Sequence, residues 1–551
     1  MLKTNLDKLF LVASIFVVLV GVFFRSISLG SIPSGMTWDE AAIGYNGFAI
    51  WQTHRDEWLE LMPTSFRSFG DYKAPLAIYL NGLFTAVLGM KLWVVRLPFV
   101  LASGKTIIGV ILMIWLLIKA RIIKFVRLST PVVLLITAVL ISFSPWHTLF
   151  SRVGFESGLA LCQLVWAADF WLIYLILPPT SIKLARVSLL GSAALVASSF
   201  YTYHSAKVVA PILLLGALIW TAKHRPHNRI FLGIVLTFLV LLLLPFLNDS
   251  LFGQGLTRAG VTVFSDYAAL TAALITLKNL VTHLLPGFMI WGNTDSLRHS
   301  TGLLGVLYPT EYLMLLIGLL TGILNFLRNK IQFLKKQAQN QVNQRHGLVF
   351  GLVWLLAGLL PAAIGHEVPH PNRALLSLPG MLIMILFGLD ISLGWLKRYS
   401  KRFSRSVISL FLVAQVMLIA AFFVQYFGPY QARSSEEYLS GYLEAFELIW
   451  QYHDGTNDKP EVDQIVMTNQ YGQPYIYALF SKQISPIAYH NGALVKFLFE
   501  DAPDINDLSR ENALIVTGAE AVGLDDSQAE EIVRDKSGEI RFRLFYTGTK
   551  Q

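Results

Sequence analysis

Long apolar runs recur along most of this chain, and they restrict what it can fold into more than any other feature. A helix needs about 18 or more apolar residues to cross a bilayer, and such runs follow one another from Leu9 to Phe427. Hydrocarbon forces backbone polar groups to bond within the segment, which favours helices. We therefore predict a polytopic α-helical membrane protein with about eleven spans, near 9–28, 97–118, 129–147, 155–177, 187–203, 207–222, 230–247, 307–326, 348–365, 374–396 and 406–427.

Charge between the apolar runs predicts the orientation, because basic loops stay in the cytoplasm. The basic segments are Lys3 with Lys8, 119–127, Lys183 with Arg186, 223–229, 328–345 and 397–405. They hold 21 lysines and arginines and a single acid, Asp7. We expect an integral protein of the plasma membrane whose N-terminus is cytoplasmic.

Because each span moves the chain to the other side of the membrane, the order of the spans predicts the side on which every later segment lies. The apolar stretch 75–89 cannot span, since one more crossing would move the basic loop at 119–127 to the wrong side, and we expect it to lie as a helix on the outer surface. The predicted domains are a transmembrane domain, 1–427, whose first outer loop at 29–96 carries juxtamembrane helices, and an acidic extracytoplasmic α/β domain, 428–551. The second domain has 10 Lys and Arg against 20 Asp and Glu. One helical pattern, 435–453, and strand patterns at 463–469, 512–518 and 541–548 predict its elements.

Composition excludes several kinds of protein. The bases lie between apolar runs instead of on one soluble face, so the net charge of +9 does not indicate nucleic-acid binding. The single cysteine, Cys162, rules out an intrachain disulfide. No P-loop, CxxC or HExxH pattern is present. Sequence patterns therefore name no cofactor.

Two adjacent acids, Asp39 and Glu40, follow the first apolar run in the stretch MTWDEAAIGYNG. One interpretation is structural, because Thr37 to Glu40 fits a capping box for a helix that runs to about Gln52. The capping box accounts for Glu40 but only partly for Asp39, which the helix dipole favours. The other interpretation is catalytic, and the sequence leaves both open.

Further charged residues of the outer loops have the same two interpretations. Lys73, just before the surface helix, is either an interfacial anchor or a cation for a phosphate at headgroup height. Arg152 and Glu156, after the third span, are either an i,i+4 helix pair or part of a site, since an acid at the mouth of a membrane helix is costly.

Three later outer loops add Lys207, Arg298 and Arg373, together with several imidazoles and carboxylates. Taken singly, each of these loops has the composition of a solvated loop. Taken together, they supply cations for a phosphate, and they leave a divalent cation open although their spacing is not a metal signature.

The motifs of residues 36–160 resemble those of a known family. The outer Asp-Glu pair, FRSFGDYKAPL leading into the surface helix, VVRLP, and ISFSPWHTLFSRVGFE are similar to segments of the GT-C glycosyltransferases. Among these, the branch of the protein O-mannosyltransferases and the lipid A aminoarabinose transferases is most similar. The resemblance covers about 1–427 and implies the GT-C fold.

The same resemblance implies roles for particular residues. Asp39 matches the general base, Glu40 the second acid of the pair, and Glu156 an acid near the centre, although SRVGFE departs from the better known members. Lys73 matches a lysine that contacts the lipid-linked phosphate, and Arg373 a donor-phosphate contact. We expect Arg152, Lys207 and Arg298 to add positive charge for that phosphate.

The implied reaction moves a sugar from a polyprenyl-phosphate donor to an acceptor hydroxyl on the outer face, with inversion. The acceptor is a protein, a lipid or a glycan, and membrane lipids surround the chain. The alternatives are a transporter or flippase of lipid-linked sugars, for which inverted repeats are expected, and a scaffold whose acidic domain binds a partner. No inverted repeat is visible in the sequence.

Overall fold

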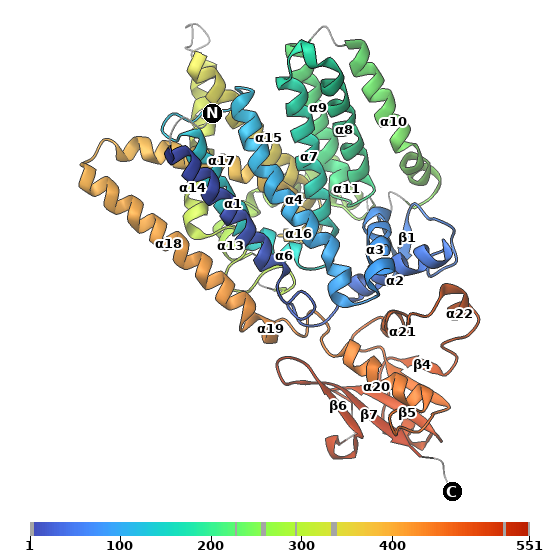
Figure 1. Cartoon of the computed structure of the whole chain (residues 1–551). Helices are drawn as coiled ribbons and strands as arrows, with labels where there is room; N and C mark the ends of the chain where they lie inside the picture. The colour runs from blue at the N-terminus through green and yellow to red at the C-terminus, as the bar shows by residue number, and fades with distance from the viewer. Residues whose placement is uncertain are drawn as a thin grey trace. The chain divides into compact units, whose positions relative to one another are not determined.

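The computed structural model describes residues 5–225, 229–254, 260–292, 295–331, 339–521 and 525–548. Contacts divide the chain into two compact units, and each is described by itself (Figure 1). Unit 1 comprises Met1–Ile27, Phe99–Ser151 and Phe155–Phe423. Unit 2 comprises Ser28–Pro98, Arg152–Gly154 and Val424–Gln551. Parts of three predicted basic segments, Lys3, 226–228 and 332–338, lie outside the described residues.

Long apolar helices make up most of the chain before residue 428. Within the described residues, nine helices are long and apolar enough to cross a membrane, which makes this a multi-pass membrane protein. They are α1 (Asn5–Ser26), α4 (Leu92–Lys119), α7 (Glu156–Ile176), α8 (Ile182–Phe200), α9 (Ala206–His224), α10 (Arg229–Phe252), α15 (Gln339–Ala363), α17 (Leu378–Leu396) with the short α16 (Pro371–Ala374) before it, and α18 (Lys401–Phe427).

The other two predicted spans are helical but irregular. Helices α5 (Thr130–Ser142) and α6 (Pro145–Ser151) replace the straight span expected at 129–147 and meet at 51°. The apolar part of α14 (Pro309–Ile331) ends at Leu324 and is shorter than a span. Eleven spans are therefore not confirmed. The predicted surface helix is α3 (Pro75–Leu88), also shorter than a span, and its place at the outer surface stays a prediction.

Glycines allow close helix packing in unit 1. Helices α14 and α17 pass each other at Gly318 and Gly388, where a Cβ atom would overlap the carbonyl oxygens of Met384 and Met314. Small residues at crossings are typical of membrane helices, which gain stability from backbone proximity. The remaining short helices of this unit are η1 (Pro179–Ser181), α11 (Val263–Asp266), α12 (Ala269–Thr282), α13 (Pro286–Trp291) and η4 (Leu375–Ser377).

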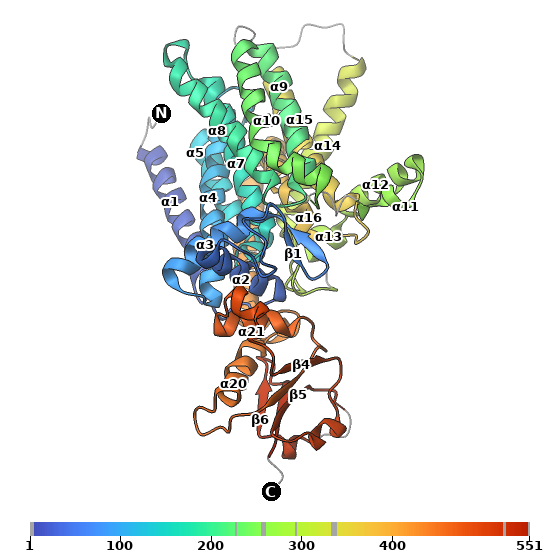
Figure 2. The ribbon, with the colours of Figure 1, turned by 90° about the vertical axis from the view of Figure 1, so that its right-hand side faces the viewer.

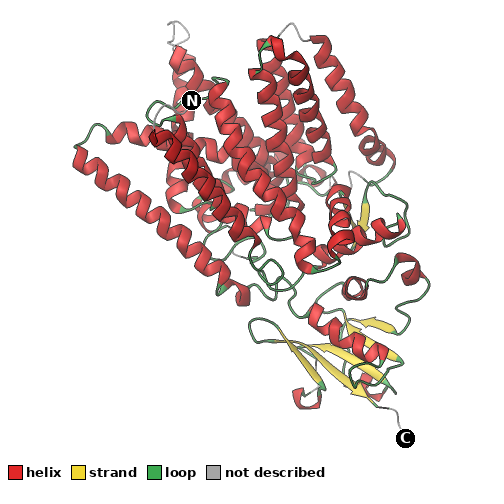
Figure 3. Ribbon diagram, in the orientation of Figure 1, coloured by secondary structure: helices red, strands yellow, loops and turns green. Residues whose placement is uncertain are grey.

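All strands of the described residues belong to unit 2 (Figure 3). A hairpin of β1 (Phe66–Ser68) and β2 (Asp71–Lys73) lies between α2 (Trp38–Thr53) and α3. The C-terminal segment contains α19 (Tyr430–Arg433), α20 (Tyr442–Asp454), β3 (Gln464–Thr468), α21 (Pro474–Lys482), α22 (Pro486–His490), β4 (Phe497–Glu500), η5 (Ile505–Ser509), β5 (Ala513–Gly518), η6 (Asp526–Gln528), β6 (Glu531–Arg534) and β7 (Ile540–Thr547).

Five of these strands form one mixed sheet in the order β4-β3-β5-β7-β6 (Figure 2). Strand β3 pairs in parallel with β4 and β5, while β7 pairs antiparallel with β5 and β6. Every residue of β5 is buried, as expected of a central strand covered on both faces. The predicted sheet-containing C-terminal domain is thereby confirmed. Its predicted helix at 435–453 is shorter than expected, because α20 begins only after Gly441, whose φ is 106°.

The core of unit 2 joins segments that are far apart in the sequence. Side chains of α2, such as Tyr45 and Phe48, share one apolar cluster with α20, β3, α21 and β5. The Tyr45 hydroxyl donates to the carbonyl of Ile484 at 2.9 Å, and the Tyr477 hydroxyl donates to the carbonyl of Met36 at 2.7 Å. Residues 28–98 therefore fold together with the C-terminal sheet. The domain boundary at 427/428 stays a prediction.

Candidate functional site

The two acids of interest lie in the first turn of α2. Thr37 is the N-cap of this helix, and its hydroxyl accepts a hydrogen bond from the backbone N–H of Glu40 at 3.3 Å. The Glu40 carboxylate accepts in return from the backbone N–H of Thr37 at 3.2 Å. The predicted capping box is confirmed, and it fixes the start of the helix whose first turn carries Asp39 and Glu40.

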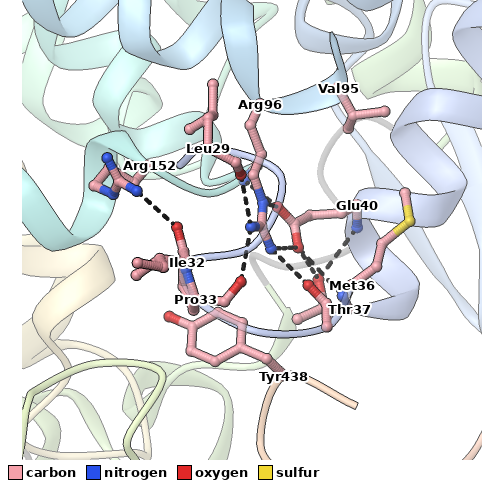
Figure 4. Close-up of polar contacts among 12 residues, drawn as sticks. Leu29, Ile32, Pro33, Met36, Thr37, Glu40, Val95, Arg96, Arg152 and Tyr438 are labelled. Atoms are coloured by element: carbon pink, nitrogen blue, oxygen red, sulfur yellow. Dashed lines mark hydrogen bonds and ion pairs between the residues drawn. The ribbon is translucent and has the colours of Figure 1, made fainter. Parts of the chain in front are cut away.

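Glu40 is buried and fully bonded (Figure 4). Its Oε1 atom lies 2.8 Å from Nε of Arg96 and accepts from the backbone N–H of Gly154 at 3.1 Å, while its Oε2 faces a second nitrogen of Arg96 at 3.2 Å. A Cβ at Gly154 would approach Glu40 Cγ to 2.9 Å, so only glycine fits there without a shift. The other guanidinium contacts of Arg96 are with the carbonyl oxygens of Leu29, Pro33 and Gly35.

Asp39 differs from its neighbour because its carboxylate reaches solvent. It forms an ion pair with the ammonium of Lys73, and 43% of the Asp39 side chain is exposed against 11% of the Lys73 side chain. The hairpin positions Lys73, since β1 and β2 pair Phe66 with Lys73 in register. The Lys73 ammonium also lies 5.9 Å from the ring centroid of Phe69. Unit 2 therefore presents an accessible carboxylate beside a mostly buried cation.

Arg152 also belongs to unit 2 and is buried. Its Nε donates to the Tyr426 hydroxyl at 3.1 Å. A terminal nitrogen of Arg152 donates to the carbonyl of Ile32 at 2.9 Å (Figure 4). Arg152 lies in the break between α6 and α7, whereas Glu156 is the first residue of α7. The interpretation of these two residues as an i,i+4 helix pair is therefore wrong, because they do not share a helix.

Unit 1 places Arg373 near both His299 and His370, and Arg298 near His299. Burial, with Arg298 and Arg373 close by, lowers the pKa of the His299 imidazole to about 4. Burial, with Arg373 as the largest charge contribution, lowers the pKa of His370 to about 3. The two rings lie 5.1 Å apart, and a terminal nitrogen of Arg373 lies 3.6 Å from Glu367 Oε2. At neutral pH both imidazoles are uncharged, so the arginines carry the positive charge here.

The remaining predicted residues have other surroundings. The Lys207 ammonium, in unit 1, lies 3.3 Å from Nδ1 of His204 and 4.9 Å from the ring centroid of Phe246. Among the residues that the structure describes, no three His, Cys, Asp or Glu side chains converge closely enough to hold a metal ion.

Glu57 is a buried acid that sequence reasoning did not single out. Its carboxylate accepts from the Asn46 amide at 3.3 Å and from the Tyr475 hydroxyl at 3.4 Å, and its backbone carbonyl lies 2.9 Å from Nε2 of His490. Burial, the largest effect, raises the pKa of Glu57 to about 7 from an ordinary value of 4.5. The sequence showed only the adjacent acids Asp56 and Glu57, and such pairs are also common in solvated loops.

This shift predicts a pH-dependent stability. The folded state binds the Glu57 proton more tightly than the unfolded chain, so its contribution is complete below about pH 4.5 and is lost as the pH rises through about 7. We expect Glu57→Gln to remove this loss, which is on the order of 3 kcal/mol. Thermal unfolding in detergent between about pH 5 and about pH 8 measures it. Glu60→Gln, at an exposed acid of the same loop, is the control, and identical pH profiles for wild type and Glu57→Gln would contradict the assignment.

Arg96 was missed as well, although the sequence contained a signal. It interrupts the apolar run VVRLP, and a charge within a membrane helix needs a partner. That partner, Glu40, is 56 residues away, so no local sequence pattern could identify it.

Comparisons with known proteins bear on the fold. No protein-family model matches the chain, and no curated protein matches it. Among solved structures, the apo oligosaccharyltransferase of Archaeoglobus fulgidus is similar over 93% of this chain and 70% of its own, at 13% identity and a TM-score of 0.50. ArnT from Cupriavidus metallidurans bound to undecaprenyl phosphate is similar over 98% of this chain and 99% of its own, at 12% identity and a TM-score of 0.49. The chain has the predicted GT-C fold.

Proposed function

We propose that the chain is an inverting glycosyltransferase that moves a sugar from a polyprenyl-phosphate donor to an acceptor hydroxyl on the outer face of the plasma membrane. The observation that carries this proposal is the exposed Asp39 carboxylate beside the Lys73 ammonium. The fold shared with an oligosaccharyltransferase supports sugar transfer as the reaction class.

In the proposed mechanism, Asp39 accepts the proton of the acceptor hydroxyl as its oxygen attacks the anomeric carbon. The bond from that carbon to the phosphate oxygen breaks in the same step, and the polyprenyl phosphate leaves with the electron pair. Lys73 stabilises the negative charge that develops on the leaving phosphate. Attack on the face opposite the leaving group inverts the anomeric configuration.

The other predicted residues take supporting roles in this proposal. Glu40, whose oxygens already face Arg96 and Gly154, positions the first turn of α2 and thereby Asp39. Arg298, Arg373, Lys207 and Glu156 belong to unit 1, and the roles predicted for them stay predictions. Arg152 donates a hydrogen bond to the backbone carbonyl of Ile32, and its guanidinium adds positive charge near that segment.

The test is transfer of radiolabelled sugar from a panel of polyprenyl-phosphate sugars to a membrane extract, with the full chain in liposomes. We expect Lys73→Met to lower transfer by about 100-fold or more, because the leaving phosphate loses the cation that stabilises its developing charge. Lys91→Met, at an exposed lysine of the same outer loop, should retain the wild-type rate.

Each alternative predicts a different outcome. Transfer by wild type with any donor identifies the sugar and supports the enzyme. Movement of labelled lipid across the bilayer without transfer would instead favour a flippase. Equal transfer by wild type and Lys73→Met would remove Lys73 from the mechanism.

A further inference from the structure

The C-terminal segment contains a pocket that the proposed mechanism does not use. Its volume is about 470 Å³, and its lining includes Asn469, Gln473, Tyr475, Phe499 and Asp501. Asn469 directly follows β3, Asp501 directly follows β4, and Gln473 is the N-cap of α21. The pocket therefore lies at the carboxyl ends of two parallel strands.

This position in the sheet is one at which α/β domains commonly bind ligands. From β3 the chain passes through α21 and α22 to β4 on one side, and from β4 it passes to β5 on the opposite side of β3. The pocket lies outside the carboxyl ends of β3 and β4. Ligands of open α/β sheets usually bind outside the carboxyl ends of the strands.

The lining indicates the chemical class of the ligand. Two amides, Asn469 and Gln473, and one carboxylate, Asp501, line the pocket, and within the described residues their side chains form no hydrogen bond. The half-buried rings of Tyr475 and Phe499 add apolar faces. Amides and a carboxylate pair with several hydroxyl groups, and the rings pack against the carbon face of a sugar. A phosphate is disfavoured, because the pocket lining includes an acid and no lysine or arginine.

A peptide is a poorer match than a saccharide. Extended peptides commonly add to the exposed edge of a sheet through backbone hydrogen bonds. The edge strands here are β4 and β6. Strand β4 contributes only Phe499 to the pocket, and the other lining residues follow the strands and most of them present side chains.

Two aromatic side chains connect the pocket with the Asp39 and Lys73 pair, all within unit 2. Gly472, in the pocket lining, lies against Trp38, and a Cβ there would be 2.9 Å from Cζ3 of that ring. Trp38 immediately precedes Asp39 in α2. On the second path, the Tyr475 ring lies 6.1 Å from the Phe69 ring, which is the ring that the Lys73 ammonium contacts.

We propose that this pocket binds the acceptor, and that the acceptor is a saccharide whose hydroxyl is presented to Asp39. This inference rests on the proposed glycosyltransferase function. It adds the class of the acceptor and assigns its recognition to the C-terminal sheet.

The first experiment measures binding and does not depend on transfer. Full-length protein in nanodiscs is applied to an array of oligosaccharides that also carries Ser/Thr-rich peptides. The pocket variant is Asn469→Ala with Asp501→Ala, and the control is Asn491→Ala with Glu511→Ala, at exposed residues of the same domain outside the pocket. We expect wild type and control to bind a set of oligosaccharides, and the pocket variant to bind them at least ten-fold more weakly.

Other results would overturn the inference. If the pocket variant binds saccharide as well as wild type does, this pocket is not the binding site. If wild type binds peptides and the variant does not, the ligand is not a saccharide. If wild type binds neither, both the pocket and the ligand class are wrong. With an acceptor in hand, we expect the variant to raise the acceptor KM at least ten-fold while the donor KM is unchanged. A wild type that binds saccharide but transfers no sugar would refute the proposed function and leave the binding site standing.

Discussion

Replacing Asp39 with asparagine is expected to lower sugar transfer by a factor of about 10² to 10⁴ while the protein stays folded and binds donor. Asparagine has nearly the same shape but cannot accept the acceptor proton at neutral pH. The side chain is 43% exposed and takes no part in the capping box, so its replacement leaves the helix start intact. The measurement is initial rate at saturating donor, at matched expression.

The control for Asp39→Asn is Glu60→Gln, which removes an exposed carboxylate from the segment between α2 and α3 and should transfer at the wild-type rate. A second check is donor binding by equilibrium titration, which should change little because Lys73 remains. Equal transfer by wild type and Asp39→Asn would exclude Asp39 as the base.

Replacing Arg96 with methionine is expected to destabilise the protein by about 3 to 5 kcal/mol. The Arg96 and Glu40 side chains are 0% and 1% exposed, so removal of the guanidinium leaves a carboxylate buried without its cation. Three backbone carbonyls of residues 29–35 lose their donor at the same time. Thermal unfolding in detergent would report the loss as a lower Tm.

A double variant separates the ion pair from the rest of the effect. Glu40→Gln with Arg96→Met removes the stranded charge, and we expect it to be more stable than Arg96→Met alone. Arg398→Met, at an exposed arginine, is the matched control and should leave the Tm unchanged. If Arg96→Met unfolds at the wild-type temperature, the ion pair does not hold this region together.

Local rules predicted much of this architecture. The length of apolar runs located the long helices, and the spacing from Thr37 to Glu40 located the start of α2, because both depend on residues that are neighbours in sequence. The same rules did not locate the break between α5 and α6, because a bent pair and a straight helix have the same apolar composition.

The contacts of the candidate site were beyond local rules. Asp39 pairs with a lysine 34 residues away, and Arg152 donates to a tyrosine 274 residues away. The spacing of residues along the chain does not predict these contacts, because the contacts depend on how the hairpin and the helices pack. Asp39, Lys73 and Arg152 could be singled out from the sequence, whereas their partners, and the buried acid Glu57, could not.

Because α2 shares its core with the C-terminal sheet, this core cannot form until the C-terminal segment has been synthesised. Residues 28–98 leave the ribosome 326 residues before Val424 does, which at about 5 to 20 residues per second corresponds to roughly 15 to 65 seconds. For that interval the apolar face of α2 has no sheet to pack against, so it must be shielded by the translocation machinery or by a chaperone. We expect a nascent chain arrested before Val424 to be degraded by proteases, even though most of its membrane helices have already been made.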